Sequence, residues 1–195
     1  MSVELKLLRK QLRLKRRKVD FFKQQQAQQK VLNRLIRLPQ FQHAQKIGLY
    51  LHAFGEIQTT QIIEYCFKQY KQIYLPMICN MNQQLVWVHI TQQQYRNKRF
   101  SHHPLGMQEP MTGRGLHVST LDFLIMPLLA CDPYGTRIGM GGGFYDKTLA
   151  SASCKPLRVG IAHDFQLIQQ RLVREKWDQP LDALITPTKC LYFNR

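Results

Sequence analysis

PLLACDPYGTRIGMGGGFYDKTL, residues 127–149, is the stretch of this sequence that decides its fold. A continuous apolar segment, Leu121–Cys131, leads into it and is broken by the turn residues at 132–135. Four glycines then fall within positions 139–143, and a helical pattern begins near Phe144. A buried strand that continues through a glycine-rich loop into a helix is typical of α/β proteins, which bind ligands at the carboxyl ends of parallel strands.

Apolar strands alternate with helical patterns on both sides of this stretch. We expect helices over Val3–Lys18, around Val31–Ile36 before Pro39, and from Thr59 or Thr60 to Tyr70, with Gln24–Gln29 as a solvated helix face. Strands are predicted at Lys46–His52, Gln72–Ile78, Leu85–Ile90, Leu157–His163 and, last in the chain, Leu181–Thr186.

The connections between these elements indicate the topology. Turn residues around Asn80–Asn82 predict that Leu85–Ile90 pairs antiparallel with the strand before it, and the polar residues 91–119 are expected to form a long loop. The remaining strands alternate with helices. The sequence therefore predicts an α/β fold, a single three-layer αβα domain over residues 1–195 with a mostly parallel, Rossmann-like sheet.

The charge of the chain is concentrated at one end. The 195 residues carry a formal charge of +16. Residues 1–37 hold 12 basic and 2 acidic side chains, whereas residues 38–195 hold 16 and 10. A hydrophobic content of 44% excludes a disordered chain. Residues 1–37 therefore carry +10 of the formal charge of +16.

The cysteines and apolar runs bear on location. Five cysteines, an odd number, show no CxxC spacing, so we expect reduced thiols in apolar surroundings. No apolar run reaches the roughly 18 residues of a membrane span, and the N-terminal residues lack the apolar core and small-residue cleavage site that we would expect of a secretory signal. These features predict a cytoplasmic protein without a membrane partner. No HxxxH or HxH spacing favours a metal site built from imidazoles.

The glycine cluster has a chemical interpretation as well as a structural one. A backbone without Cβ atoms can turn its N–H groups inward around an anion, and a following helix adds the positive end of its dipole. Arg137 places a cation beside the cluster, and Asp146 in the first helical turn is suited to Mg²⁺. Phe144 breaks a GxGxxG match and no Gly-Lys pair follows, so neither common phosphate motif applies. The alternative for the cluster is an ordinary tight turn.

The string at 127–149 resembles the signature of the 5-formyltetrahydrofolate cyclo-ligase (methenyltetrahydrofolate synthetase) family. Four further segments are similar to family motifs and occur in the same order: LLRKQLRLKRR at 7–17, IGLYLHAFGEIQT at 47–59, LGMQEP at 105–110 and WDQPLDALITPT at 177–188. The resemblance covers nearly the whole chain. One departure is Cys131, where the family usually has Phe before the aspartate.

The resemblance implies a reaction. Members of the family convert 5-formyltetrahydrofolate to 5,10-methenyltetrahydrofolate while ATP is cleaved to ADP and phosphate. Phosphorylation turns the formyl oxygen into a leaving group, and the folate N10 then attacks. Such chemistry asks a protein for positioning, cations and Mg²⁺ rather than for a nucleophile. No Ser-His-Asp or Cys-His arrangement stands out in the sequence.

The resemblance also assigns residues. Arg137 and Tyr145 are implied to be catalytic, and Glu109 is placed by its motif without a definite role. The implied ATP contacts are Lys6, Arg9, Lys10, Arg137, Gly139, Met140, Gly141, Gly142, Gly143, Phe144 and Tyr145. The implied folate contacts are Leu51, Glu56, Met140, Gly141, Gly142, Gly143 and Phe144. Asp146 and Asp178 are implied to bind Mg²⁺.

Each assignment has a structural alternative. A solvated face is the default interpretation for any one lysine on the first helix, and Asp178 also fits a surface turn. Glu56 could be a charge ahead of the helix that follows it. Leu51 could belong to the core, and Phe144 with Tyr145 could pack a helix onto the sheet.

Other functions compete with the one that the resemblance implies. A charge of +10 over residues 1–37 also suits RNA, although no RNP-like strand, KH clamp or zinc knuckle is present. A sugar-phosphate isomerase or an acyl-CoA transferase would need a carboxylate in the site, for which Glu56 is the candidate. We expect small-molecule substrates, no requirement for nucleic acid, and a monomer.

Overall fold

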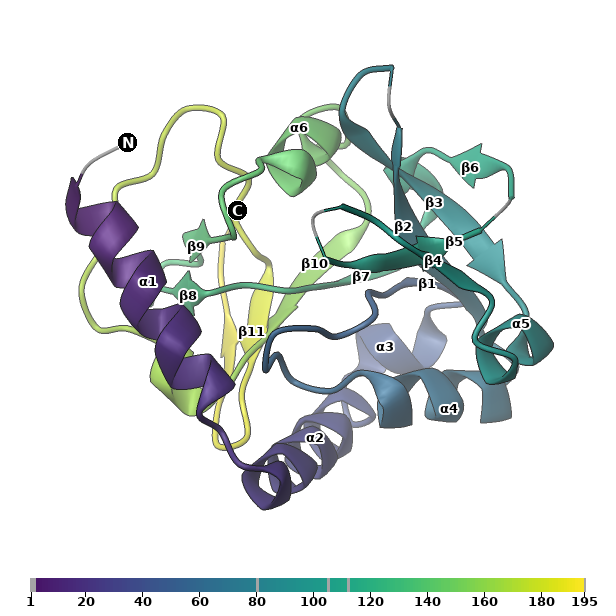
Figure 1. Ribbon diagram of the computed structural model, residues 1–195, viewed down its shortest axis with the longest axis horizontal. Coiled ribbons are helices and arrows are strands. Elements are labelled where there is room, and N and C mark those ends of the chain that lie inside the picture. Colours follow the sequence, from purple (N-terminus) through teal and green to yellow (C-terminus); the bar gives the residue numbers. More distant parts are fainter. Residues whose placement is uncertain (1–2, 80, 105, 112, 195) are drawn as a thin grey trace.

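An eight-stranded sheet forms the middle of the fold in the computed structural model, which describes residues 3–79, 81–104, 106–111 and 113–194 (Figure 1). The strand order is β12-β11-β10-β7-β1-β2-β3-β6. The strands of this sheet are β1 Lys46–Gly48, β2 Gln72–Cys79, β3 Gln84–Ile90, β6 Gly115–Leu116, β7 Phe123–Met126, β10 Leu157–Ile161, β11 Ala183–Ile185 and β12 Cys190–Tyr192.

The centre of this sheet is parallel and its edges are antiparallel. Strands β11, β10, β7, β1 and β2 pair in parallel, while β12 pairs antiparallel with β11, and β3 with both β2 and β6. All four residues of β7 are buried, as the middle strand of a sheet covered on both faces requires. The predicted mostly parallel α/β fold is confirmed.

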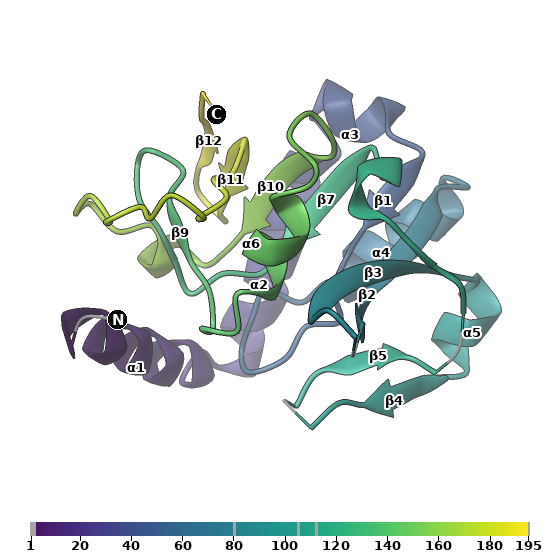
Figure 2. The same ribbon diagram turned by 90° about the horizontal axis from the view of Figure 1, so that it is seen from above.

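Helices cover both faces of the sheet unequally. The helices are α1 Val3–Arg17, α2 Phe21–Leu35, α3 Pro39–His43, α4 Thr60–Lys68, α5 Gln92–Arg96 and α6 Phe144–Leu149, with 3-10 turns at Val118–Thr120 and Asp164–Gln166. Helices α2, α3 and α4 lie on one face, and the six-residue α6 lies on the other (Figures 1 and 2). Helix α1 lies outside the sheet, where Leu12 packs against Leu129, Ala130 and Ile138. No helix in the described ranges is long and apolar enough to cross a membrane.

The apolar segment Leu121–Cys131 is not one strand, as the sequence led us to expect. Strand β7 ends at Met126, because Pro127 has no N–H to donate to a neighbouring strand. The chain then leaves the sheet, and β8 Ala130–Cys131 pairs antiparallel with β9 Arg137–Ile138 in a separate hairpin. The intervening turn is built on buried Asp132, whose Oδ1 accepts hydrogen bonds from two backbone N–H groups.

The prediction of a long loop over residues 91–119 is also wrong. This segment contains helix α5, strand β6 and a further hairpin, in which β4 Phe100–His102 pairs antiparallel with β5 Gln108–Pro110. Thr91 and Gln94 close a capping box at the start of α5. Such short elements are held by caps and tertiary contacts, which leave little periodicity in a sequence. Positions 105 and 112 lie outside the described residues.

Smaller corrections concern the ends of elements. Strand β1 ends at Gly48, four residues earlier than predicted, and Leu181–Thr186 is not the last strand, because β12 follows β11. The hairpin of β2 with β3 is confirmed, although Asn80 of its predicted turn lies outside the described residues. Cys154 is exposed, so not every cysteine has apolar surroundings.

Candidate active site

Three segments meet beside the carboxyl end of the central strands. They are helix α1, the loop after β1 and the glycine loop at 139–143. The chain reaches the glycine loop through the β8–β9 hairpin, which Figure 1 shows next to α1. The chain leaves the sheet at Pro127, where strand β7 ends, and the hairpin that follows places the glycine loop next to the first helix.

The basic side chains of α1 differ sharply in their surroundings. Arg9 is half-buried, and its Nε donates to the carbonyl oxygen of Gly139 at 3.2 Å. Burial and Arg13 lower the pKa of Arg9, while the nearby Asp178 carboxylate opposes that shift. Lys6 and Lys10 are exposed on the outer side of the helix. The structure thus brings Arg9 to the glycine loop and leaves the two lysines at its solvent side.

Arg16 is the residue that the sequence analysis missed. It is 1% exposed, and its guanidinium lies 3.3 Å from Oε1 of Glu56. Nε donates to the carbonyl oxygen of Phe54 at 2.9 Å, Nη1 to that of Leu128 at 3.2 Å, and Nη2 contacts Sδ of Met140 at 3.8 Å. Its spacing from Arg9 was the available signal, because residues seven apart share one face of a helix.

The loop after β1 holds a buried carboxylate. Glu56 accepts a hydrogen bond from the Ala53 N–H through Oε2, and its side chain is 10% exposed. Burial raises the pKa of Glu56, and the Arg16 guanidinium opposes this rise. The loop is held from below by helix α2, where Gln24 donates to the carbonyl oxygen of Gly55 at 2.9 Å. Gln24 and Gln28 are buried, which corrects the prediction that Gln24–Gln29 is a solvated face.

Two tyrosines lie next to this carboxylate. Burial raises the pKa of both Tyr50 and Tyr145, and the charge of Glu56 adds to the rise in each case. Both phenols therefore stay protonated at neutral pH. The hydroxyl of Tyr50 is buried and has no hydrogen-bond partner among the described residues. A donor without a partner beside a carboxylate marks a place where a ligand could bind.

The glycine loop is open where it faces solvent. Gly141 and Gly143 have φ angles of +111° and +66°, which side chains with a Cβ rarely adopt. A Cβ added at either position would meet no atom within 4 Å. Glycine is required there by the backbone conformation rather than by crowding. Gly143 caps α6 without a side-chain bond, and α6 has six residues, so its dipole is smaller than the sequence led us to expect.

Arg137 and Asp146 form an ion pair behind this loop. Nη2 of Arg137 lies 2.6 Å from Oδ1 of Asp146, and the arginine side chain is 5% exposed. The same oxygen accepts from the N–H of Gln179 at 3.0 Å. The Arg137 guanidinium lies 5.8 Å from the centre of the Tyr145 ring, and its Nε is buried without a partner in the described part of the chain.

The two acids predicted to bind Mg²⁺ are connected through the backbone of Gln179. Gln179, which bonds to Asp146, follows Asp178 directly in the chain. Asp178 accepts from the Glu175 N–H through Oδ2 at 2.8 Å. Within the residues that the structure describes, no group of three or more His, Cys, Asp or Glu could hold a metal ion. Two carboxylates do fit an ion that is shared with phosphate oxygens, which is the usual mode of Mg²⁺.

A model of the 5-formyltetrahydrofolate cyclo-ligase family matches residues 2–187. The chain belongs to this family. The 5-formyltetrahydrofolate cyclo-ligase of Escherichia coli K12 is 36% identical over 183 residues, which cover 91% of this chain and 97% of that protein. The cyclo-ligase of Haemophilus influenzae is 33% identical over 91% of this chain and 95% of its own. The structure is similar to that of the 5,10-methenyltetrahydrofolate synthetase of Aquifex aeolicus, with a TM-score of 0.83, 28% identity, and coverage of 98% and 93%.

Other residues that the cyclo-ligase motifs single out have packing contacts. Leu51 is half-buried against the core on the α2 and α4 side. Phe144 packs against the opposite core cluster, and a Cβ added at Gly142 would lie 2.5 Å from its ring. Glu109 accepts from the Ile78 N–H at 3.2 Å, so its carboxylate ties strand β5 to β2.

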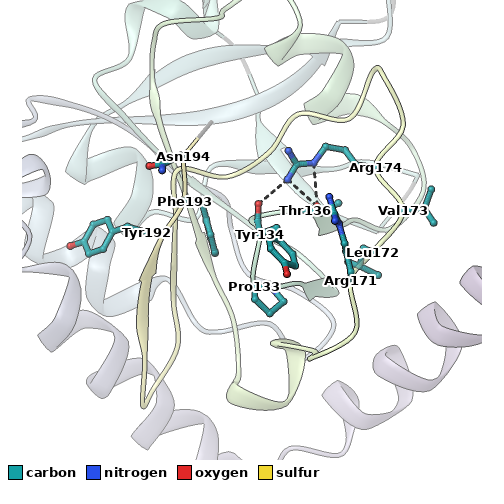
Figure 3. A pocket seen from close by; sticks show the side chains of 10 residues that line it. All are labelled: Pro133, Tyr134, Thr136, Arg171, Leu172, Val173, Arg174, Tyr192, Phe193 and Asn194. Carbon is teal, nitrogen blue, oxygen red and sulfur yellow. Dashed lines mark hydrogen bonds between the residues drawn. The ribbon is translucent and has the colours of Figure 1, made fainter.

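A cavity of this cyclo-ligase family member lies between the turn at 133–136, residues 171–174 and residues 192–194. It has a volume of about 720 Å³ (Figure 3). Arg174 is fixed in its wall by bonds to Thr136 Oγ1 and the Tyr134 carbonyl oxygen, and Arg171 lies 4.9 Å from the Tyr134 ring centre. None of the predicted site residues lines it. The ten lining residues are Pro133, Tyr134, Thr136, Arg171, Leu172, Val173, Arg174, Tyr192, Phe193 and Asn194.

Proposed function

We propose that this protein cyclises 5-formyltetrahydrofolate to 5,10-methenyltetrahydrofolate while ATP is converted to ADP and phosphate, at the junction of α1, the loop after β1 and the glycine loop. Membership of the cyclo-ligase family supports the reaction. The location of the active site is supported mainly by one observation, which is that the glycine loop lies between two arginines. Arg9 holds Gly139 from α1, and Arg137 lies behind the loop on Asp146.

Phosphoryl transfer to a formyl oxygen depends on stabilising the charge of the transition state and does not need an enzyme nucleophile. The developing charge lies on phosphate oxygens, which arginines and oriented N–H groups stabilise best in a site that excludes water. We assign Arg9, Arg137 and the backbone of 139–143 to the ATP phosphates. Lys6 and Lys10, exposed on α1, would attract the nucleotide and contact it at the outer edge.

The folate lies, in this proposal, against Glu56. A buried carboxylate that is paired on one oxygen with Arg16 keeps acceptor capacity for the N–H groups of a bound ring. Leu51, Met140 and Phe144 would supply apolar contacts to the same ring. Tyr145 is a protonated phenol between Glu56 and Arg137, so we assign it to the reacting end of the folate together with Arg137.

Asp146 and Asp178 would hold Mg²⁺, which supplies charge neutralisation at the phosphates when it is bound. The contribution of the chain is to keep both carboxylates in place. Arg137 and the Gln179 N–H hold Asp146, and the Glu175 N–H holds Asp178. No direct bond between the two acids is required.

We further propose a cytoplasmic monomer whose partners are these small molecules and that requires neither nucleic acid nor a membrane. Both substrates are polyanions, the nucleotide through its phosphates and the folate through its glutamate tail. A basic first helix therefore steers them to the site. RNA binding is the competing use of that helix, but it leaves the attachment of Arg9 to Gly139 without a purpose.

The deciding experiment mixes protein, MgATP and 5-formyltetrahydrofolate and follows the absorbance of methenyltetrahydrofolate. We expect turnover by the wild type, and a loss of about 100-fold or more for Asp146→Ala with the fold retained. Glu64→Ala, an exposed acid on α4, is the matched control and should keep full activity. A wild type without product or binding of either substrate would overturn the proposal. Tight, salt-sensitive RNA binding that survives Asp146→Ala would favour the alternative.

A further inference from the structure

Arg16 connects three parts of the site through one buried side chain. Its guanidinium contacts Phe54 and Glu56 after β1, Leu128 after β7, and Met140 in the glycine loop. These segments are far apart in the sequence, and no other contact described above joins all three. A guanidinium carries five N–H donors in a fixed plane, which allows it to bond in several directions at once.

The position of Arg16 also ties the site to helix α1. Arg9 and Arg16 lie seven residues apart, about 10 Å along one helix face, so the helix that holds Gly139 at one end holds Glu56 at the other. Gly55 approaches the helix directly, because a Cβ at this position would lie 2.4 Å from the Arg16 carbonyl oxygen. The last turn of α1 and the loop after β1 are therefore in backbone contact.

From this geometry we infer that Arg16 is a positioning residue for the cyclo-ligase reaction, which holds Glu56 as an ionised acceptor for the folate and fixes the glycine loop at Met140. The inference rests on the proposed function. It predicts that loss of Arg16 weakens folate binding, although Arg16 itself lies beneath the loop and does not touch the reacting atoms. The charge on Glu56 is the quantity that Arg16 controls.

The surroundings of Glu56 make that charge depend on Arg16. The groups that face the carboxylate are Arg16 from α1, Tyr50 after β1 and Tyr145 from α6, while His163 bonds to the neighbouring carbonyl at 3.2 Å. Burial lowers the pKa of His163, so it is neutral at pH 7. Arg16 is thus the cation of this set that faces Glu56, and without it a buried carboxylate takes up a proton at higher pH.

The test compares Arg16→Met with wild type in steady-state assays from pH 5.5 to 8.5. We expect the KM for 5-formyltetrahydrofolate to rise on the order of 100-fold, and the KM for ATP to rise less than 10-fold. The acid limb of kcat/KM for the folate should move up by about one pH unit. Lys18→Met removes one exposed charge directly after the end of the same helix and should change none of these values.

Two further variants keep the inference falsifiable. Arg16→Lys retains the charge without the planar donors, so we expect an intermediate folate KM and little movement of the acid limb. If Arg16→Met does not fold, the Arg16→Lys variant alone is compared with the wild type. In a Glu56→Gln background, Arg16→Met should add little, because the two residues act as a pair.

The outcomes separate this inference from the function on which it rests. A wild type without cyclo-ligase activity would overturn both. An active wild type whose Arg16 variants lower kcat alone, leave the acid limb unchanged and add fully to Glu56→Gln would overturn only the positioning role. Arg16 would then stabilise the fold and nothing more.

Discussion

Replacing Gly55 with alanine should move the Glu56 loop away from helix α1. Gly55 has a φ angle of +77°, and its missing Cβ is the reason that the two segments can touch. A Cβ built there lies 2.4 Å from the carbonyl oxygen and 2.8 Å from the carbonyl carbon of Arg16, and 3.2 Å from the Arg17 nitrogen. All three are backbone atoms, so no side-chain rotation can relieve the overlap.

The expected loss of stability has two parts. A left-handed conformation costs a residue with a Cβ about 1–2 kcal/mol, and forcing an extra methyl group into a packed contact costs about 1–3 kcal/mol. The sum predicts that Gly55→Ala lowers the free energy of unfolding by about 2–5 kcal/mol. Gly143→Ala is the control, because Gly143 has a φ angle of +66° and no atom within 4 Å of its added Cβ. It should lose only the first part.

Urea unfolding at pH 7 measures both variants against the wild type. We expect Gly55→Ala to be less stable than Gly143→Ala by at least about 1 kcal/mol. Where it folds, Gly55→Ala should also raise the KM for the folate, since the loop carries Glu56. Equal losses for the two variants would show that the overlap relaxes without cost, and would refute the argument that α1 and this loop are in fixed backbone contact.

Three further measurements test the surroundings of the site. Burial lowers the pKa of His163 below its ordinary value of 6.5, so below that pH the unfolded chain binds more protons than the folded one. The free energy of unfolding should therefore fall as the pH drops through about 6.5. His163→Gln should flatten this pH dependence in urea unfolding. Thr148→Val leaves the N–H of Leu85 without its 2.7 Å partner and should cost about 1–3 kcal/mol in thermal or urea unfolding, whereas Thr148→Ser should cost less. The exposed thiol of Cys154 should react with a disulfide reagent at once, while the buried Cys66, whose pKa is raised to about 12, should react only after unfolding; equal rates would contradict the burial.

The parts of the fold that could be predicted from the sequence are those that local patterns control. The β2–β3 hairpin and the start of α6 at Phe144 follow from apolar alternation and from the glycines before the helix. The β8–β9 hairpin could not be predicted in this way. The residues of β8 are apolar like those of β7, and the separation depends on a single missing N–H at Pro127 and on the turn at Asp132. Both are local hydrogen-bonding effects that hydrophobicity alone does not reveal.

The cations of the basic helix also differ in how far the sequence predicts their role. Arg9 was singled out by the family motif, and Arg16 was hidden among neighbouring cations in the sequence. Helical periodicity distinguishes the two kinds of cation. Leu5 and Leu12 form the apolar face of α1, and Arg9 and Arg16 fall on that face at the same three- and four-residue spacing.

An arginine on the apolar face of an amphipathic helix places its charge inside the protein. The free energy lost by removing the guanidinium from water is offset only where hydrogen-bond acceptors or a carboxylate lie beside it. Arg9 bonds to Gly139 and Arg16 pairs with Glu56, whereas Lys6 and Lys10 lie exposed on the outer surface. The basicity of the first helix therefore serves two purposes. In the proposed site, Arg9 and Arg16 hold the glycine loop and Glu56 in place, and the exposed cations create a field that attracts polyanionic substrates, which weakens as salt increases. High salt should accordingly raise the KM of the wild type for ATP while leaving the effect of Arg16→Met on the folate KM unchanged.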